Sequence, residues 1–156
     1  MAKIILIMGL PGSGKSTLAN KLAQKIGADH FRSDSIREQY DDWDFSEEGR
    51  KRQTLRMRDL ALNSKKTYAI CDFICPKKEY RDILQADYIV WMDTISKGRY
   101  DDTNELFEKP DKKISHEQIP IIIITHETTK KHLKNVLAKI EKLDFVLEGI
   151  TVITID

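Results

Sequence analysis

Apolar residues recur along this chain with two different periods, and their alternation predicts the secondary structure. Short runs such as Ile4 to Met8 have the length and composition of strands buried on both faces. Longer stretches such as Lys15 to Ile26 place apolar residues three and four positions apart, which predicts amphipathic helices. We expect strands at 3–8, 28–33, 67–72, 86–92, 121–125 and 150–155, and helices at 15–26, 36–40, 46–63, 77–84 and around Leu133, Val136, Leu137, Ile140 and Leu143.

Strands that alternate with helices favour an α/β domain with a mostly parallel sheet of about five strands, flanked by helices in a three-layer arrangement. The length of 156 residues is typical of one compact domain, so we expect a single domain over 1–156. The segment 94–119 is rich in charge and poor in large apolar residues, which predicts a lid rather than core. The alternating tail 150–155 predicts an extra edge strand, on which a homodimer is possible.

Residues 9–16, which follow the first expected strand and run into the first expected helix, match the eight-position pattern G-x-x-x-x-G-K-[ST]. Glycines in this pattern let backbone N–H groups converge on phosphate oxygens, while Lys15 reaches the β and γ oxygens and the Ser16 hydroxyl can ligate Mg²⁺. A strand before the loop and a helix after it are the context that the motif requires. The sequence therefore predicts a P-loop NTPase fold, with nucleotide phosphates bound by Gly9, Pro11, Gly12, Ser13, Gly14, Lys15, Ser16 and Thr17.

Acidic residues follow two further expected strands, at the sheet edge where open parallel sheets bind their ligands. Asp72 is placed like the acid that holds Mg²⁺ directly or through water in P-loop enzymes, and its alternative role is a turn cap. Asp34 and Arg37 lie on one helical face and can meet an acceptor hydroxyl and its attached anion. Their alternative role is a helix cap and an exposed arginine.

The overall charge is close to zero, with 26 basic and 25 acidic residues, so we expect no general affinity for nucleic acid or membranes. The N-terminal apolar run is too short for a signal peptide or a spanning helix, which favours a cytoplasmic protein. The basic stretch from Arg50 to Arg58 is either a solvated face or a source of anion ligands. Cys71 and Cys75 are expected to be reduced, structural thiols, and none of the four histidines has metal-site spacing.

Four segments resemble motifs of the adenylylsulfate kinases, and the resemblance spans most of residues 3–143. Residues 31–37, 44–50, 73–76 and 97–100 are similar, in order, to that family's Gly-Asp-Asn-x-Arg, Gly-Phe-Ser-x-x-Asp-Arg, Phe-Ile-Ser-Pro and Lys-Gly-Leu-Tyr segments. The resemblance implies transfer of the γ-phosphoryl group of ATP, with Mg²⁺, to the 3′-hydroxyl of adenylyl sulfate. It also implies a small-molecule nucleotide acceptor and a place in sulfate assimilation.

Carried over position by position, the resemblance implies roles for individual side chains. Lys15 and Asp34 would be catalytic, with Asp34 orienting or deprotonating the acceptor hydroxyl. Ser16 and Asp72 would hold Mg²⁺. The implied acceptor site comprises Asp34, Arg37 and Arg50 for its anionic oxygens, Phe45 for its adenine, Gln53, Phe73 and Ile74 as further contacts, and Lys97 from the lid.

The sequence departs from the family at several of these positions. Gln53 replaces an asparagine, Leu55 an arginine, Cys75 a serine and Asp72 a residue that is often serine, and the segment after Asp93 lacks the Arg-Asp pair that precedes Lys-Gly-Leu-Tyr. The sequence therefore leaves more than one phosphoryl acceptor to be considered. One alternative is a P-loop kinase for a polynucleotide 5′-hydroxyl or a modified nucleoside, with the basic run along a nucleic-acid backbone. Another is a nucleotide-binding module without turnover.

Overall fold

The computed structural model describes residues 1–110 and 121–123, which belong to one compact unit, Met1–Ile124. Its sheet has the strand order β2-β3-β1-β4-β5, and each pair of neighbouring strands is parallel. The predicted fold class is therefore confirmed. The strands are β1 (Lys3–Gly9), β2 (Asp29–Arg32), β3 (Tyr68–Asp72), β4 (Tyr88–Met92) and β5 (Ile121–Ile123), and the helices are α1 (Lys15–Ile26), α2 (Ser33–Gln39), α3 (Glu47–Leu62), α4 (Lys78–Leu84) and α5 (Asp101–Leu106).

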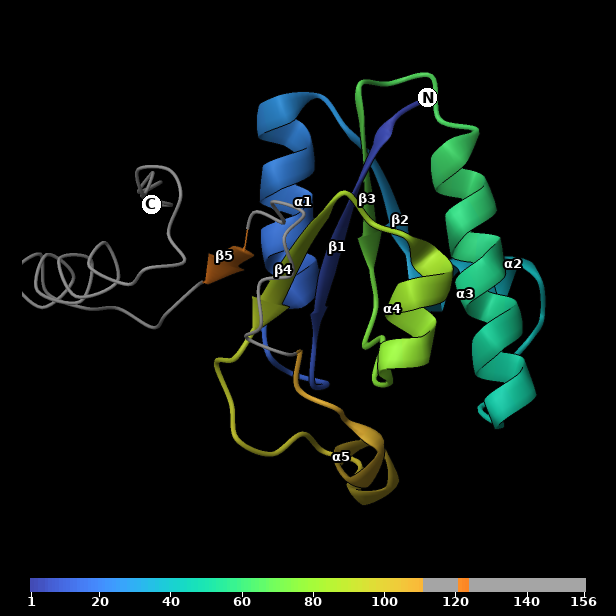
Figure 1. Cartoon of the computed structure of the whole chain (residues 1–156), viewed down its shortest axis with the longest axis vertical. Helices are drawn as coiled ribbons and strands as arrows, with labels where there is room; N and C mark the ends of the chain where they lie inside the picture. Colours follow the sequence, from blue (N-terminus) through green and yellow to red (C-terminus); the bar gives the residue numbers. More distant parts are fainter. Residues whose placement is uncertain (111–120, 124–156) are drawn as a thin grey trace, which may run out of the picture. The chain divides into compact units, whose positions relative to one another are not determined.

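Helices cover both faces of the sheet, so β1 is buried on each side. Helix α1 lies against one face, while α3 and α4 lie against the other (Figure 1). Ile5 and Ile7 of β1 pack in the cluster on the α1 face, and Leu6 and Met8 pack in the cluster on the opposite face. This explains why β1 is apolar without interruption instead of alternating with polar residues.

Local signals in the sequence account for the start of α3 and the end of α1. Ser46 caps α3, because its Oγ accepts a hydrogen bond from the Gly49 N–H at 3.2 Å. Gly27 ends α1 with a φ of 64°, and its N–H donates to the Ala23 carbonyl. These ends agree with the ranges expected from the sequence.

Two helices differ from expectation. Helix α2 begins at Ser33 instead of Ile36, so Asp34 lies in the first turn of the helix. The helix dipole stabilises a carboxylate at that position. Helix α5 lies within the expected lid segment, where no helix was predicted. Its six residues have no apolar periodicity, and Asn104 closes the turn before it through hydrogen bonds with both the N–H and the carbonyl of Gly98.

The remaining expectations concern residues outside the described part. They are the lid from 111 to 119, the helix around 133–143, the edge strand 150–155 with its possible homodimer surface, and a single domain extending to residue 156. These stay predictions. Within residues 1–110 and 121–123, no helix is long and apolar enough to span a membrane.

Candidate active site

The P-loop begins at Gly9, the last residue of β1, and ends in the first turn of α1. Its backbone lies close to the end of β4, because a Cβ at Gly9 would stand 2.7 Å from the Met92 carbonyl oxygen. Gly14, the residue before α1, has a φ of 89°, which side chains rarely allow. Within the described residues the buried Ser13 Oγ has no hydrogen-bond partner, so the loop retains a free polar atom for an incoming anion.

Lys15 is folded into the P-loop, with only 9% of its surface exposed. Its Nζ donates to the Leu10 carbonyl at 2.9 Å. Burial lowers the pKa of the Lys15 ammonium, and the negative charges of Asp72 and Asp34 oppose that shift. Both carboxylates therefore act electrostatically on the same ammonium.

Asp72 ends β3 beside the P-loop strand, opposite Ile7 of β1. It is 2% exposed, and its Oδ2 lies 3.3 Å from His30 Nε2 on β2. A nearly buried carboxylate requires such a partner. Asp34 is its counterpart nearer to solvent, with 72% of its side chain exposed and its Oδ2 3.6 Å from Arg32 Nη2. One acid is thus enclosed beside the phosphate loop, and the other faces outward.

Arg37, Phe45 and Arg50 form a contiguous group that we call the arginine–phenylalanine cluster. The Arg37 Cζ lies 4.7 Å from the centroid of the Phe45 ring, and the Arg50 Cζ lies 5.7 Å from it. Phe45 remains 54% exposed. The tertiary structure therefore unites three of the predicted acceptor residues, with an aromatic ring open to solvent.

Arg37 is more buried than an anion ligand at the surface would be. It is 4% exposed, and its Nη1 donates to the carbonyls of Asp42 at 2.8 Å and Asp44 at 2.9 Å. Burial is the largest influence on the Arg37 guanidinium and lowers its pKa. Arg37 thus ties α2 to the loop that carries Phe45, whereas Arg50 donates to the Phe45 carbonyl at 2.9 Å through Nε.

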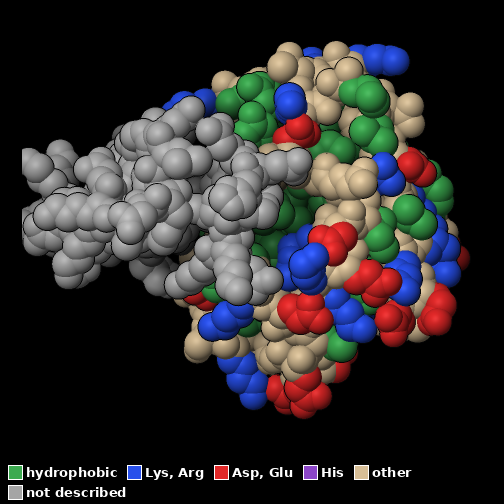
Figure 2. Space-filling model, in the orientation of Figure 1, with side chains coloured by type: hydrophobic (Ala, Val, Ile, Leu, Met, Phe, Trp, Pro, Cys, Tyr) green, Lys and Arg blue, Asp and Glu red, His purple; other side chains and the backbone are tan. Residues whose placement is uncertain are grey.

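The basic run on α3 is neutralised by the acidic loop before it. Arg52 donates to Asp42 and Asp44, and Arg56 donates to Asp42. Hydrogen bonds from Arg52 and Arg56 hold the pKa of the Asp42 carboxyl well below its usual range. Acidic and basic side chains are interspersed on the face that Figure 2 shows. Arg52 and Arg56 are thus paired with acids inside the protein, which leaves the run less positive charge for a nucleic-acid backbone.

The other predicted acceptor contacts, Gln53, Phe73 and Ile74, are buried or half-buried, and the first two make hydrogen bonds within the protein. Gln53 is 2% exposed, donates to the carbonyl and the hydroxyl of Ser33, and accepts from Arg56. Phe73 is half-buried against the core on the α3 face, and its N–H donates to the Ile7 carbonyl. Ile74 is half-buried in the loop that follows β3.

The described part of the lid segment contacts the P-loop. The Thr94 Oγ1 donates to the Ser13 carbonyl at 2.7 Å. Arg50 Nη2 lies 4.0 Å from Asp102 Oδ2, which links α5 to the arginine–phenylalanine cluster. Lys97 is 70% exposed and pairs with Asp101 in its own segment at 2.9 Å, so the structure does not bring it to the other predicted site residues in the described part.

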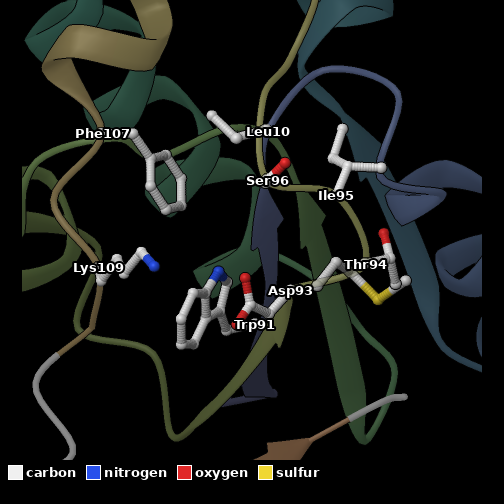
Figure 3. A pocket seen from close by; sticks show the side chains of 9 residues that line it. Leu10, Trp91, Asp93, Thr94, Ile95, Ser96, Phe107 and Lys109 are labelled. Atoms are coloured by element: carbon white, nitrogen blue, oxygen red, sulfur yellow. The ribbon is translucent and has the colours of Figure 1, made fainter. Parts of the chain in front are cut away.

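A pocket of about 340 Å³ lies on the other flank of the P-loop, at the end of β4. The side chains of Trp91, Phe107 and Lys109 border one space together with Leu10 of the P-loop (Figure 3). The Lys109 Nζ lies 5.9 Å from the centroid of the Trp91 ring. Two aromatic rings and a cation suit a planar ring that carries or adjoins negative charge. The full lining is Leu10, Trp91, Met92, Asp93, Thr94, Ile95, Ser96, Phe107 and Lys109.

The residues around the P-loop fit Mg²⁺ bound together with a nucleotide. No group of three or more His, Cys, Asp or Glu side chains among the described residues could hold a metal ion. Mg²⁺ in phosphate sites needs fewer protein ligands, because phosphate oxygens and water supply the rest. The buried Asp72 carboxylate and the half-buried Ser16 hydroxyl are a suitable pair of oxygen donors.

Sequence reasoning missed several contacts that shape this site. His30 had no motif around it, yet it bonds to Asp72. Asp42 lies in an acidic stretch without any pattern, yet it joins Arg52 and Arg56. Thr94 and Asp102 were expected only as parts of a polar lid. The sequence held a signal for Asp42 alone, since the acidic stretch adjoins the basic run.

The five-stranded order, the P-loop after the central strand and the acids at the neighbouring strand ends define the fold and site of a P-loop kinase. The matching sequence family confirms this class. Residues 4–86, more than half of the chain, match the AAA domain family AAA_33, and the chain belongs to that family.

Curated relatives confirm the predicted resemblance to adenylylsulfate kinases. The chain is 35% identical over 92 residues to an adenylyl-sulfate kinase of Bacillus licheniformis, covering 54% of this chain and 47% of that enzyme. It is 29% identical over 127 residues to one of Bacillus velezensis, covering 76% and 59%. A shikimate kinase of Actinobacillus pleuropneumoniae is 28% identical over 115 residues, covering 68% and 66%. The matches thus span about half to two thirds of these relatives.

Solved structures share the fold at lower identity. The APS kinase CysC of Mycobacterium tuberculosis, in complex with AMPPNP and APS, has a TM-score of 0.59 and 20% identity, covering 90% of this chain and 98% of that chain. A gluconokinase of Sinorhizobium meliloti has a TM-score of 0.60 and 16% identity, covering 90% and 92%. Kinases for different acceptors share this fold, so the fold alone leaves the acceptor undefined.

Proposed function

We propose that the protein is an ATP-dependent phosphotransferase that moves the γ-phosphoryl group of ATP to the 3′-hydroxyl of adenylyl sulfate. The observation that carries this proposal is the position of Asp34. Its exposed carboxylate lies in the first turn of α2, the helix that also carries Arg37 of the arginine–phenylalanine cluster, and its charge acts on the P-loop ammonium. An acid linked in this way to a phosphate site and to an aromatic, cationic surface suits a nucleotide acceptor. We expect such a reaction in the cytoplasm, as a step of sulfate assimilation.

The acceptor would lie against the arginine–phenylalanine cluster. Its adenine would stack on the exposed ring of Phe45, and its anionic oxygens would meet the guanidinium of Arg50. Asp34 would accept or orient the proton of the 3′-hydroxyl. Arg37 would act mainly by holding the Phe45 loop, because two backbone carbonyls already occupy its Nη1. Gln53, Phe73, Ile74 and Lys97 stay predicted contacts.

The donor would occupy the P-loop and the pocket on its other flank. Because β3 and β4 lie on opposite sides of β1, Asp72 and Trp91 flank the loop on opposite sides. The acceptor and the base of ATP would then approach from opposite directions, as an in-line transfer requires. Lys15 would leave the Leu10 carbonyl to meet the β and γ oxygens. Mg²⁺ held by Ser16 and Asp72 would offset the charge of the phosphate oxygens.

The polynucleotide alternative finds less support in the charges of α3. Arg52, Arg56 and Arg58 donate to Asp42, Asp44 and Gln85 within the protein, so binding a phosphate backbone would first break these contacts. Small hydroxyl acceptors other than adenylyl sulfate remain alternatives, as the similarity to a shikimate kinase indicates. A module without turnover is the third alternative.

One assay separates these candidates: ATP consumption with adenylyl sulfate, short 5′-hydroxyl oligonucleotides, free nucleosides and shikimate, compared side by side. We expect turnover with adenylyl sulfate only. Asp34→Asn should lower kcat about 10²- to 10⁴-fold, in line with the loss of a general base, and leave ATP affinity unchanged. Turnover with another acceptor would reassign the substrate. Loss of ATP binding in Asp34→Asn would make Asp34 structural.

A further inference from the structure

His30 and Asp72 are brought together by the register of two parallel strands. His30 on β2 lies opposite Ile70 on β3, and Asp72 is two residues farther along the same strand. Residues two apart on a strand point to the same face, so the imidazole and the carboxylate are diagonal neighbours. Ile70 packs in the cluster on the α1 face, which is the side that holds the P-loop helix. The pair therefore lies on the α1 face of the sheet, where the charge of Asp72 acts on Lys15.

Arg32 and Lys15, the two charged side chains discussed beside Asp72, make their contacts with other groups. Arg32 is its partner in register, but the Arg32 guanidinium lies 3.6 Å from the Asp34 carboxylate. Lys15 acts on Asp72 through its charge, while its Nζ donates to the Leu10 carbonyl. Among residues 1–110 and 121–123, the hydrogen-bond contact of the Asp72 side chain is from His30 Nε2 to Oδ2, at 3.3 Å.

We propose that His30 is a positioning residue for the metal-binding acid. Its imidazole, in the tautomer with a proton on Nε2, donates to Oδ2 of Asp72 and limits rotation of the carboxylate. The other oxygen, Oδ1, is then left for Mg²⁺ or one of its waters. Mg²⁺ demands near-ideal octahedral geometry, so a carboxylate held in one orientation binds it better than a mobile one. This inference rests on the proposed function only in requiring a metal–nucleotide complex at the P-loop.

A purely structural role for His30 makes a different prediction. The side chain is 19% exposed and could serve only to satisfy the nearly buried Asp72. Its replacement would then lower the stability of the fold without changing the metal requirement. Metal affinity, measured apart from stability and turnover, therefore separates the two roles.

The experiment measures Mn²⁺ binding to the full chain in the presence of ADP, by electron paramagnetic resonance. The variants are His30→Phe, which removes the donor, and His30→Gln, whose amide can reproduce the Nε2 donor. We expect His30→Phe to weaken Mn²⁺ binding about 10- to 100-fold and His30→Gln to stay within about threefold of the wild type, as for other partners of metal-binding side chains. His30→Asn, whose amide is too short to reach Asp72, replaces His30→Phe if the latter does not fold.

Two controls frame the result. Asp72→Asn should weaken Mn²⁺ binding at least as much as His30→Phe, and Arg32→Gln should leave it unchanged. Mn²⁺ affinity equal to wild type in a folded His30→Phe protein with a lower melting temperature would overturn the proposal. Wild type that binds Mn²⁺ and ADP but phosphorylates no acceptor would refute the proposed function alone. Wild type that binds no Mn²⁺ with ADP would overturn both.

Discussion

Gly49 packs so closely on Asp44 that a Cβ at residue 49 would overlap the Asp44 carboxylate and carbonyl. The Asp44 Oδ1 accepts a hydrogen bond from the Ser46 N–H at 2.9 Å, and the Ser46 Oγ accepts one from the Gly49 N–H at 3.2 Å. The similar family segment reads Gly-Phe-Ser-x-x-Asp-Arg, whereas this chain has Asp44-Phe45-Ser46-Glu47-Glu48-Gly49-Arg50. The glycine and the aspartate have exchanged places. In this chain the carboxylate that accepts from the Ser46 N–H is therefore that of Asp44.

This exchange predicts a coupled pair of substitutions. Gly49→Asp alone should destabilise the protein by about 1–3 kcal/mol, because the new side chain overlaps Asp44. The double variant Asp44→Gly/Gly49→Asp should recover at least half of that loss, since residue 49 can then cap the Ser46 N–H. Urea unfolding measures both, with Gly49→Ala as the control for steric overlap. Additive effects of the two substitutions would show that they act independently.

The buried ammonium of Lys15 should destabilise the folded protein in the absence of nucleotide. Its pKa is lowered in the folded state by burial, so the unfolded chain holds the proton more tightly. Stability should therefore rise as the pH increases through the window between the folded pKa and the ordinary value of 10.5. Lys15→Met, similar in length and uncharged, should be at least as stable as wild type at neutral pH and should lack this rise. Its turnover should fall about 10²-fold or more. Thermal unfolding across pH, combined with a turnover assay, checks both halves, and a less stable Lys15→Met protein would contradict the first.

Arg37→Lys should separate the geometry of this side chain from its charge. Lysine keeps the charge but loses the planar group that spans two carbonyls and stacks on Phe45. We expect a loss of about 1–3 kcal/mol in stability and a higher KM for the acceptor, with KM for ATP unchanged. Arg52→Lys, at a side chain that is 48% exposed, is the matched control and should cost about 0.5 kcal/mol or less. Equal effects of the two substitutions would contradict the role of Arg37 in holding the Phe45 loop.

The two thiols should be inert in the folded protein. Burial raises the pKa of Cys71 to about 12 and also raises the pKa of Cys75. The thiolate is the reactive form, so neither residue should react with Ellman's reagent at pH 8 within minutes. Both should react stoichiometrically in concentrated urea. Rapid modification of either thiol without denaturant would show that the core around that cysteine opens.

The proposed role of the pocket beside Leu10 in binding the base of ATP can be tested by comparing ATP with tripolyphosphate, which has no base. Trp91→Ala should weaken ATP binding about 10-fold or more, because one base–aromatic contact contributes about 1–3 kcal/mol. Binding of tripolyphosphate should stay unchanged, since it engages only the P-loop. Trp91→Phe keeps an aromatic ring and should bind ATP nearly normally. Phe45→Ala should weaken binding of the acceptor and leave binding of ATP unchanged. Equal losses of ATP and tripolyphosphate affinity in Trp91→Ala would place the base elsewhere.

The sequence predicted the elements of the fold and one side of the site because their causes are local. Apolar period and length located the described strands and every described helix except α5, and Ser46 and Gly27 mark helix ends through contacts within a few residues. The P-loop motif is contiguous, so Gly9 to Thr17 could be recognised without knowing the fold. Its position between a strand and a helix also implied that acids at neighbouring strand ends would lie near Lys15.

Only the tertiary structure decided which side chains meet across the sheet and between helices. His30 meets Asp72 because of the register of β2 on β3, and no spacing within either strand encodes it. Asp42 neutralises α3, and Arg37 is buried under Phe45, because a loop folds back onto a helix. Such contacts depend on packing over tens of residues. The phosphate loop could therefore be predicted from the sequence. The partners that orient the nearby acids and shape the proposed acceptor surface could not.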